Sequence, residues 1–218
     1  MAVEIASSAT SRPAELAADA IVHGIGLCAA VAGAAGLIVL AAINRDGLQI
    51  VTVTAYSVGL VTMLACSTIY NMAERSRHRE LLRRIDHAAI FVMIAGTYTP
   101  FTTLALHGDF AVAMTVFVWA MAAFGVALKL SVPSQRLGNL SMGLYLTFGW
   151  IGLIIMWPLL GAVGVQILIL LGLGGAIYSL GTIVYAFDRL PFQRAIWHAC
   201  VVLAAAVHYA AIASLVHG

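Results

Sequence analysis

Seven long, mostly apolar runs constrain this 218-residue chain more than any other feature. A helix needs roughly 20 apolar residues to cross the hydrocarbon core of a bilayer, and its backbone polar groups are then satisfied within the segment. The period-2 alternation of a transmembrane barrel is not seen in these runs. We therefore predict an all-α bundle of seven membrane-spanning helices, at about 20–43, 49–72, 85–106, 110–130, 138–160, 163–187 and 193–215.

Composition supports an integral membrane protein. The chain is 62% hydrophobic and 9% charged, with a mean hydropathy of +1.01, whereas soluble domains are about a quarter charged. We interpret residues 1–17 as a short cytoplasmic tail and residues 18–218 as a single membrane domain. Small residues at 33–36 and 172–175 predict helices that approach one another closely. Nucleic acid is not an expected partner, because the basic residues form no extended face.

The positions of lysine and arginine predict the orientation of the chain. If the N-terminus is cytoplasmic, all 11 of these residues except Arg45 fall on the inner side, as the positive-inside rule expects. Seven spans then place the C-terminus outside. The residues on the predicted inner side are Arg12, Arg75, Arg77, Arg79, Arg83, Arg84, Lys129, Arg136, Arg189 and Arg194.

Polar residues gather at the predicted cytoplasmic ends of four spans. Spacings of four residues place them on single helix faces in the first, second and seventh spans. Each residue alone can be an ordinary interfacial group with a structural role. Their common depth instead favours a polar functional cavity, because ionisable groups in a membrane are costly. The set is Glu15, Asp19, His23, Ser67, Asn71, Asp86, His87, Arg194 and His198.

Several of these residues lie in strings that resemble the hemolysin III family, within the wider progestin and adiponectin receptor group. The similarity extends from about Glu15 to His208. It rests on Glu15…His23-Gly-Ile-Gly, Ser67-Thr-Ile-Tyr-Asn71, Arg84-Ile-Asp86-His87…Ala95-Gly-Thr-Tyr-Thr-Pro-Phe101 and Ala195-Ile-Trp-His198…His208-Tyr. The resemblance implies seven helices with the N-terminus inside, in agreement with the arginine count.

The resemblance also implies a zinc site near the cytoplasmic surface. In adiponectin receptors three histidines hold the ion, one from helix 2 and two from helix 7, and an aspartate at the start of helix 3 bonds zinc-bound water. Here only His198 and Asp86 match, because Asn71 and Arg194 stand at the other two ligand positions. Asparagine is a poor zinc ligand, and arginine cannot be one because it stays protonated.

The sequence leaves two outcomes open for this site. Substitute ligands could come from His23, His87 or Glu15, so that the cofactor is zinc. Alternatively there is no metal, and Arg194 takes its place by pairing with Asp86, with hydrogen bonds from Asn71 and His198.

We carry three interpretations of function. The first, which we prefer, is a membrane protein whose cytoplasmic-side cavity binds or senses lipid and affects membrane lipid homeostasis, with a degenerate zinc site. The second is a zinc-dependent hydrolase of membrane lipid amides, with Asp86 and Ser67 as candidate catalytic residues and His198 as a ligand. The third is a membrane-perturbing cytolysin. Whether the protein is an enzyme stays open. The expected partners are membrane lipids, and the expected location is a bacterial inner membrane.

Overall fold

The protein is a bundle of long helices. The computed structural model describes residues 2–187 and 190–217, and gives only the backbone of residues 2–12 and 134–139. The described part of the chain contains no strand. The elements are α1 (Ala2–Asn44), α2 (Gly47–Met72), α3 (Arg79–Pro100), the π-helix η1 (Phe101–Ala105), α4 (Gly108–Ser131), α5 (Ser134–Trp150), α6 (Gly152–Leu159), α7 (Val165–Tyr185) and α8 (Gln193–His217).

Seven helical segments in this part of the chain are long and apolar enough to cross a membrane, which confirms the predicted fold class. α3 and η1 together form the third, and the fifth consists of most of α5 with α6. The largest differences from the predicted spans are at the N-terminal ends of α1 and α3. α1 is helical from Ala2, with Pro13 inside it, and α3 begins at Arg79. The first turns of α3 hold charged residues because Glu80 pairs with Arg83 and Arg84, at 2.8 and 3.1 Å.

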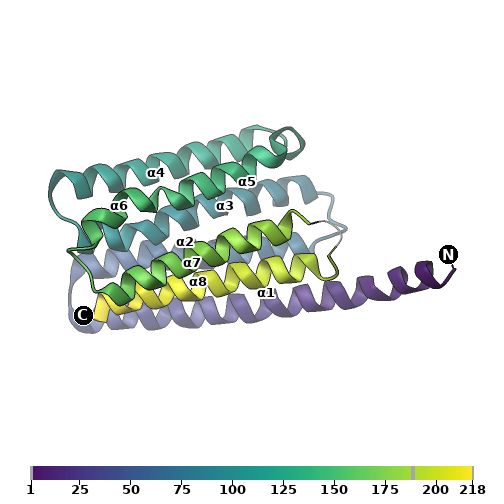
Figure 1. Ribbon diagram of the computed structural model, residues 1–218, viewed down its shortest axis with the longest axis horizontal. Helices are drawn as coiled ribbons and strands as arrows, with labels where there is room; N and C mark the ends of the chain where they lie inside the picture. The colour runs from purple at the N-terminus through teal and green to yellow at the C-terminus, as the bar shows by residue number, and fades with distance from the viewer. Residues whose placement is uncertain (1, 188–189, 218) are drawn as a thin grey trace.

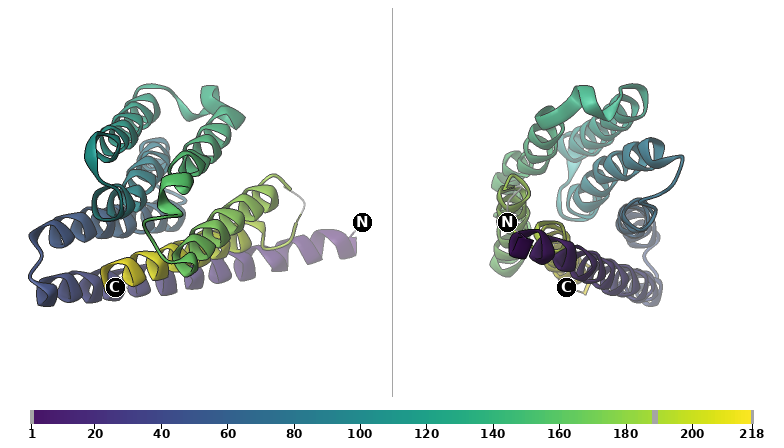
Figure 2. Two further views of the ribbon diagram at one scale, coloured as in Figure 1. Left: turned by 60° about the vertical axis from the view of Figure 1, so that its left-hand side comes forward. Right: turned by 90° about the vertical axis from the view of Figure 1, so that its right-hand side faces the viewer.

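The helices are arranged in a ring around a more central α3. Sequence neighbours contact one another from α1 to α4, α7 contacts α8, and α8 returns to α1 to close the ring (Figures 1 and 2). Of the seven spans, the third has the largest buried share. The N-terminal part of α1 extends beyond the bundle (Figure 1). The first and last helices therefore lie side by side, although they are at opposite ends of the chain.

The two ends of the bundle differ in charge. We call the end that carries residues 73–78, the turn between α2 and α3, the basic-loop end. Arg45 follows α1 at the opposite end. Arg189 lies outside the described residues, and so do the side chains of Arg12 and Arg136. Which end is cytoplasmic stays a prediction from the charges.

Glycines lie where helices approach closely, as the sequence predicts. A Cβ atom added to Gly59 of α2 would lie 3.2 Å from the backbone oxygen of Val92 in α3. One added to Gly174 of α7 would lie 2.4 Å from the ring of His208 in α8. In lipid, contacts of this kind replace the hydrophobic effect as the main source of helix association.

Candidate functional site: a buried polar cluster between four helices

Polar side chains from α1, α2, α3 and α8 meet inside the bundle at the basic-loop end. Their buried members include Asp19 and His23, whose exposed fractions are 2% and 3%. The spacing of four residues places Asp19 and His23 on one face of α1, and α1 contacts both α2 and α8. We call this group the polar cluster; its members are Asp19, His23, Ser67, Asn71, Asp86, Arg194 and His198.

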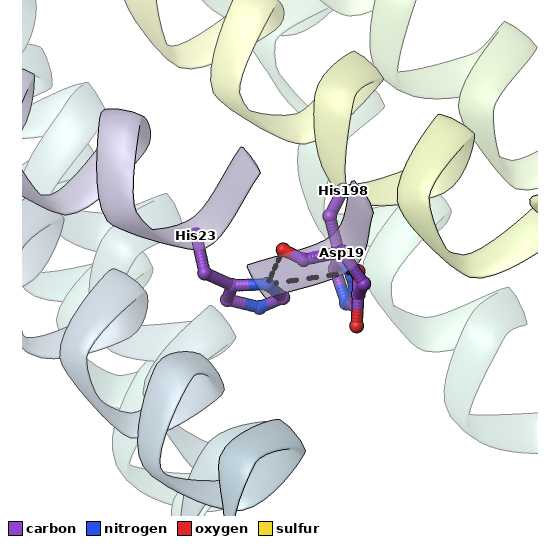
Figure 3. A group of neighbouring side chains, drawn as sticks. All are labelled: Asp19, His23 and His198. Atoms are coloured by element: carbon purple, nitrogen blue, oxygen red, sulfur yellow. Dashed lines mark hydrogen bonds and ion pairs between the residues drawn. The ribbon is translucent and has the colours of Figure 1, made fainter. Parts of the chain in front are cut away.

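Asp19 is the centre of the polar cluster. Its Oδ1 accepts a hydrogen bond from His198 Nδ1 at 2.6 Å, which joins α1 to α8. His23 Nδ1 lies 3.6 Å from the same oxygen and donates to the Asp19 backbone carbonyl at 2.8 Å. The imidazole rings of His23 and His198 have their centroids 4.3 Å apart (Figure 3). One carboxylate therefore orients two neighbouring histidines.

α2 contributes Ser67 and Asn71 on the other side of His23. The Ser67 hydroxyl lies 3.2 Å from His23 Nε2, and the Asn71 amide nitrogen lies 3.4 Å from it. Asn71 also donates to the backbone oxygen of Ser67 at 2.9 Å, which fixes its side chain against α2. Asp86, which is 8% exposed, interacts with Ser67 and His198 from a position about two turns into α3. The polar cluster thus spans four helices, as the common depth of these residues predicts.

Arg194 closes the polar cluster toward the surface. It donates to Asn71 Oδ1 at 2.9 Å and to Glu74 Oε1 at 3.4 Å, and its Nη2 lies 3.6 Å from Asp19 Oδ2. The predicted pair between Arg194 and Asp86 is wrong, because the carboxylates paired with Arg194 in the described structure are those of Asp19 and Glu74. The reason is geometric: α8 lies directly beside α1, and its contact with α3 is slight.

Two residues of the predicted set make their described contacts elsewhere. The carboxylate of Glu15 accepts from the backbone nitrogen of Phe192 at 3.3 Å, just before α8 begins. His87 faces α5, and the centroid of its ring lies 6.5 Å from the centroid of the Tyr145 ring. Adjacent residues on a helix point about 100° apart, so Asp86 and His87 cannot both face the same neighbour.

The structure also shows polar groups that the sequence reasoning did not single out for the site. Glu74, just after α2, pairs with Arg194. Lys129, one of the basic residues that predict the orientation, is only 1% exposed. Its ammonium group donates to Ser141 of α5 and lies 5.3 Å from the centre of the Tyr145 ring. A lysine near the end of an apolar span looks interfacial in sequence, and only the packing of α5 reveals its burial.

A cavity lies beside the polar cluster at the basic-loop end. It has a volume of about 330 Å³ and is lined by Leu16, Asn71, Met72, Glu74 and Arg75. Asn71 belongs to both the cavity and the polar cluster. The lining combines two apolar side chains with two of opposite charge, so it offers both kinds of contact to an amphipathic molecule.

The zinc ion implied by the family resemblance can be tested against these residues. Asn71 and Arg194 do not fit at two of the three implied ligand positions, for the chemical reasons given above. Asp19, His23 and His198 do fit, because each offers a ligand atom and these atoms lie within 4.8 Å of one another. Two imidazoles and a carboxylate are ordinary zinc ligands. Asp19 Oδ2 is buried and accepts no hydrogen bond in the described structure.

Comparison with known proteins identifies the family. Residues 16–209 match the family described as "Haemolysin-III related". The chain is 37% identical over 184 residues to the "Hemolysin-3 homolog" of Bacillus subtilis (strain 168), covering 84% of this chain and 86% of that protein. It is 32% identical over 181 residues to "Hemolysin-3" of Bacillus cereus, covering 83% and 82%.

A relative outside the bacteria is also similar. The human "Monocyte to macrophage differentiation factor" is 31% identical over 206 residues, covering 91% of this chain and 83% of that protein. It is a member of the progestin and adiponectin receptor group. The family match over residues 16–209 extends over nearly all the membrane-spanning segments and includes every residue of the polar cluster. The chain is an integral membrane protein that belongs to the hemolysin III family, within the progestin and adiponectin receptor group.

Proposed function

We propose that this protein binds membrane lipid at the polar cluster and the cavity beside it, and that this binding affects membrane lipid homeostasis. The observation that carries the proposal is the cavity of about 330 Å³, which includes Asn71 of the polar cluster in its lining. We place the protein in a bacterial inner membrane, with the basic-loop end in the cytoplasm. Its bacterial relatives support this placement.

The cavity suits a molecule with a polar head and an apolar tail. Glu74 and Arg75 offer both charges to a headgroup, while Leu16 and Met72 offer an apolar edge. Arg194 lies behind Asn71 and is itself 41% exposed, so a second positive charge is within reach of the cavity. Charged groups at the end of a membrane bundle are costly unless they are paired or lie against a wet or polar ligand space. A lipid headgroup would supply that contact.

The proposal can be tested by filling the cavity without changing its charges. Leu16→Trp places a large ring at the apolar edge, and Arg45→Gln is a control at the opposite end of the bundle. We expect purified wild type and Arg45→Gln to retain the same lipid class, measured by mass spectrometry of the lipids bound in detergent, and Leu16→Trp to lose most of it. Identical lipid profiles in all three folded proteins would refute the proposal.

A zinc-dependent hydrolase of membrane lipid amides is the second candidate. The observation that favours it is the group of Asp19, His23 and His198, which offers metal ligands in place of those missing at Asn71 and Arg194. A zinc ion held there would polarise a carbonyl group and activate water. Asp86 and Ser67 would hold and pass a proton beside it. Release of fatty acid from lipid amides by the purified protein, abolished in Asp86→Asn, would move this candidate to first place.

A further inference from the structure

A second group of polar side chains lies apart from the polar cluster, where α3, α4 and α5 meet. We call it the lysine site; its members are Arg83 and His87 of α3, Lys129 of α4, and Ser141 and Tyr145 of α5. We infer that the lysine site binds a phosphate group, carried either by an anionic lipid or by a soluble phosphate. This inference goes beyond the proposed function, because the lysine site shares no residue with the polar cluster or with the cavity beside it.

Lys129 carries a buried charge that forms no ion pair with a carboxylate in the described part of the chain. Its ammonium donates one hydrogen bond, to Ser141, and lies 5.3 Å from the centre of the Tyr145 ring. An ammonium group has three N–H donors, so the others are left for a further acceptor. A buried cation without a counter-charge is costly in a membrane protein. An anion bound at Lys129 would remove that cost.

The charged neighbours of Lys129 leave an excess of positive charge. Arg83 lies close enough to repel Lys129, and Asp86 of the polar cluster lies close enough to attract it. Glu80 is shared between Arg83 and Arg84, at 2.8 and 3.1 Å. Three cations thus face two carboxylates. The remaining positive charge matches the single negative charge of a phosphodiester, and lysine is a common phosphate ligand in proteins.

His87 adds a polar atom that lacks a partner. Its Nδ1 is buried and makes no hydrogen bond in the described structure. The ring lies close enough to Lys129 to interact with it electrostatically, and the backbone oxygen of His87 accepts a hydrogen bond from the Tyr145 hydroxyl at 3.1 Å. With a proton on Nδ1, this nitrogen would donate to a phosphate oxygen beside the ammonium.

The position of the lysine site along the helices suits a lipid headgroup. Lys129 lies in the last turn of α4, and Arg84 donates to the backbone oxygen of Leu130 at 3.3 Å, which joins the first turns of α3 to the end of α4. The side chain of Arg83 is 30% exposed. The long apolar stem of a lysine near the end of a span lets its ammonium reach the interface. A phosphate at the headgroup level is therefore within reach of both cations.

The first test is titration of the full-length, delipidated protein in detergent with phosphatidylglycerol, followed by native mass spectrometry. We expect a saturable site that binds phosphatidylglycerol more tightly than phosphatidylcholine, which has no net charge. Lys129→Met keeps the length of the apolar stem and should weaken binding by about tenfold or more, because a hydrogen bond to a charged group is lost. Arg77→Gln removes an equal charge from the exposed basic loop and should change binding by less than about twofold.

The second test needs no variant, because Lys129 is the only lysine in the chain. An amine-reactive ester is added to the wild type, and acylation of Lys129 is measured by mass spectrometry of peptides. Phosphatidylglycerol should slow this acylation, and phosphatidylcholine should not. If inorganic phosphate slows it as well, the ligand is a soluble phosphate; if only phosphatidylglycerol does, the ligand is a lipid headgroup. Both results support the lysine site.

Two results would overturn the inference: a folded Lys129→Met variant that binds phosphatidylglycerol as the wild type does, or acylation of Lys129 that neither phosphatidylglycerol nor inorganic phosphate slows. Leu16→Trp, which fills the cavity beside the polar cluster, should leave protection of Lys129 unchanged. The lysine site and the proposed function can therefore fail independently of each other.

Discussion

At the scale of single residues, Asp19 holds the polar cluster together. Its carboxylate contacts His198 and Arg194 of α8. Its backbone carbonyl accepts a hydrogen bond from His23, one turn later on α1. Asp19 is almost completely buried, so its interactions are poorly screened by water. Glu15, one turn earlier on α1, makes a single described contact near the surface. Asp19 and Glu15 look equivalent in the sequence, but we expect them to contribute differently to the stability of the fold.

This difference predicts the outcome of a matched pair of substitutions. Asp19→Asn should lower the free energy of unfolding by about 2–4 kcal/mol, because it removes a buried charge that several groups share. Glu15→Gln should change it by less than about 1 kcal/mol, as for an ordinary surface contact. Unfolding in a detergent and denaturant series, followed by circular dichroism, measures both. Equal effects would mean that Asp19 is not the centre of the cluster.

At the scale of helices, small residues decide which faces can touch. α7 shows this within one turn, because a Cβ at Gly174 would collide with the ring of His208, whereas a Cβ at Gly172 would meet nothing within 4 Å. The sequence string 172–175 predicts close packing, but it does not say which of its glycines faces α8. The Nε2 of His208 in turn donates a hydrogen bond to the backbone oxygen of Leu171 in α7, at 3.3 Å.

Gly172 and Gly174 of α7 give a second prediction. Gly174→Ala should destabilise the bundle by about 1–3 kcal/mol, since overpacking forces His208 or the helix to move. Gly172→Ala should be neutral or slightly stabilising, because alanine is the better helix former. Thermal unfolding in the same detergent compares them. A larger loss in Gly172→Ala than in Gly174→Ala would contradict the described contact between α7 and α8.

At the scale of the whole molecule, the contact of α8 with α1 builds the site. Asp19 and His198 are 179 positions apart and are joined at 2.6 Å. The same arrangement places the polar cluster beside the cavity lined by Asn71 and Glu74, next to the basic loop at one end of the bundle. The polar cluster therefore depends on how the first and last helices of the chain pack together.

The orientation of the molecule can be tested directly. In a variant without its native cysteines, Ser76→Cys lies in the basic loop and Gly47→Cys lies at the opposite end. The positive-inside rule predicts that a membrane-impermeant maleimide labels Gly47→Cys in intact cells and labels Ser76→Cys only after the membrane is opened. The reverse pattern would invert the topology and place the polar cluster outside.

The sequence by itself determined the class of the fold, the positions of the spans and the residues that could meet at one end. These follow from local physics, because the length of an apolar run, the placement of arginines and a spacing of four residues need no knowledge of distant contacts. Tertiary structure alone decided the pairing. It turned His87 toward Tyr145, buried Lys129 against Ser141, and gave Arg194 to Asp19 and Glu74 rather than to Asp86. Helix rotation and neighbour order decide such contacts, and both depend on how all the helices pack at once.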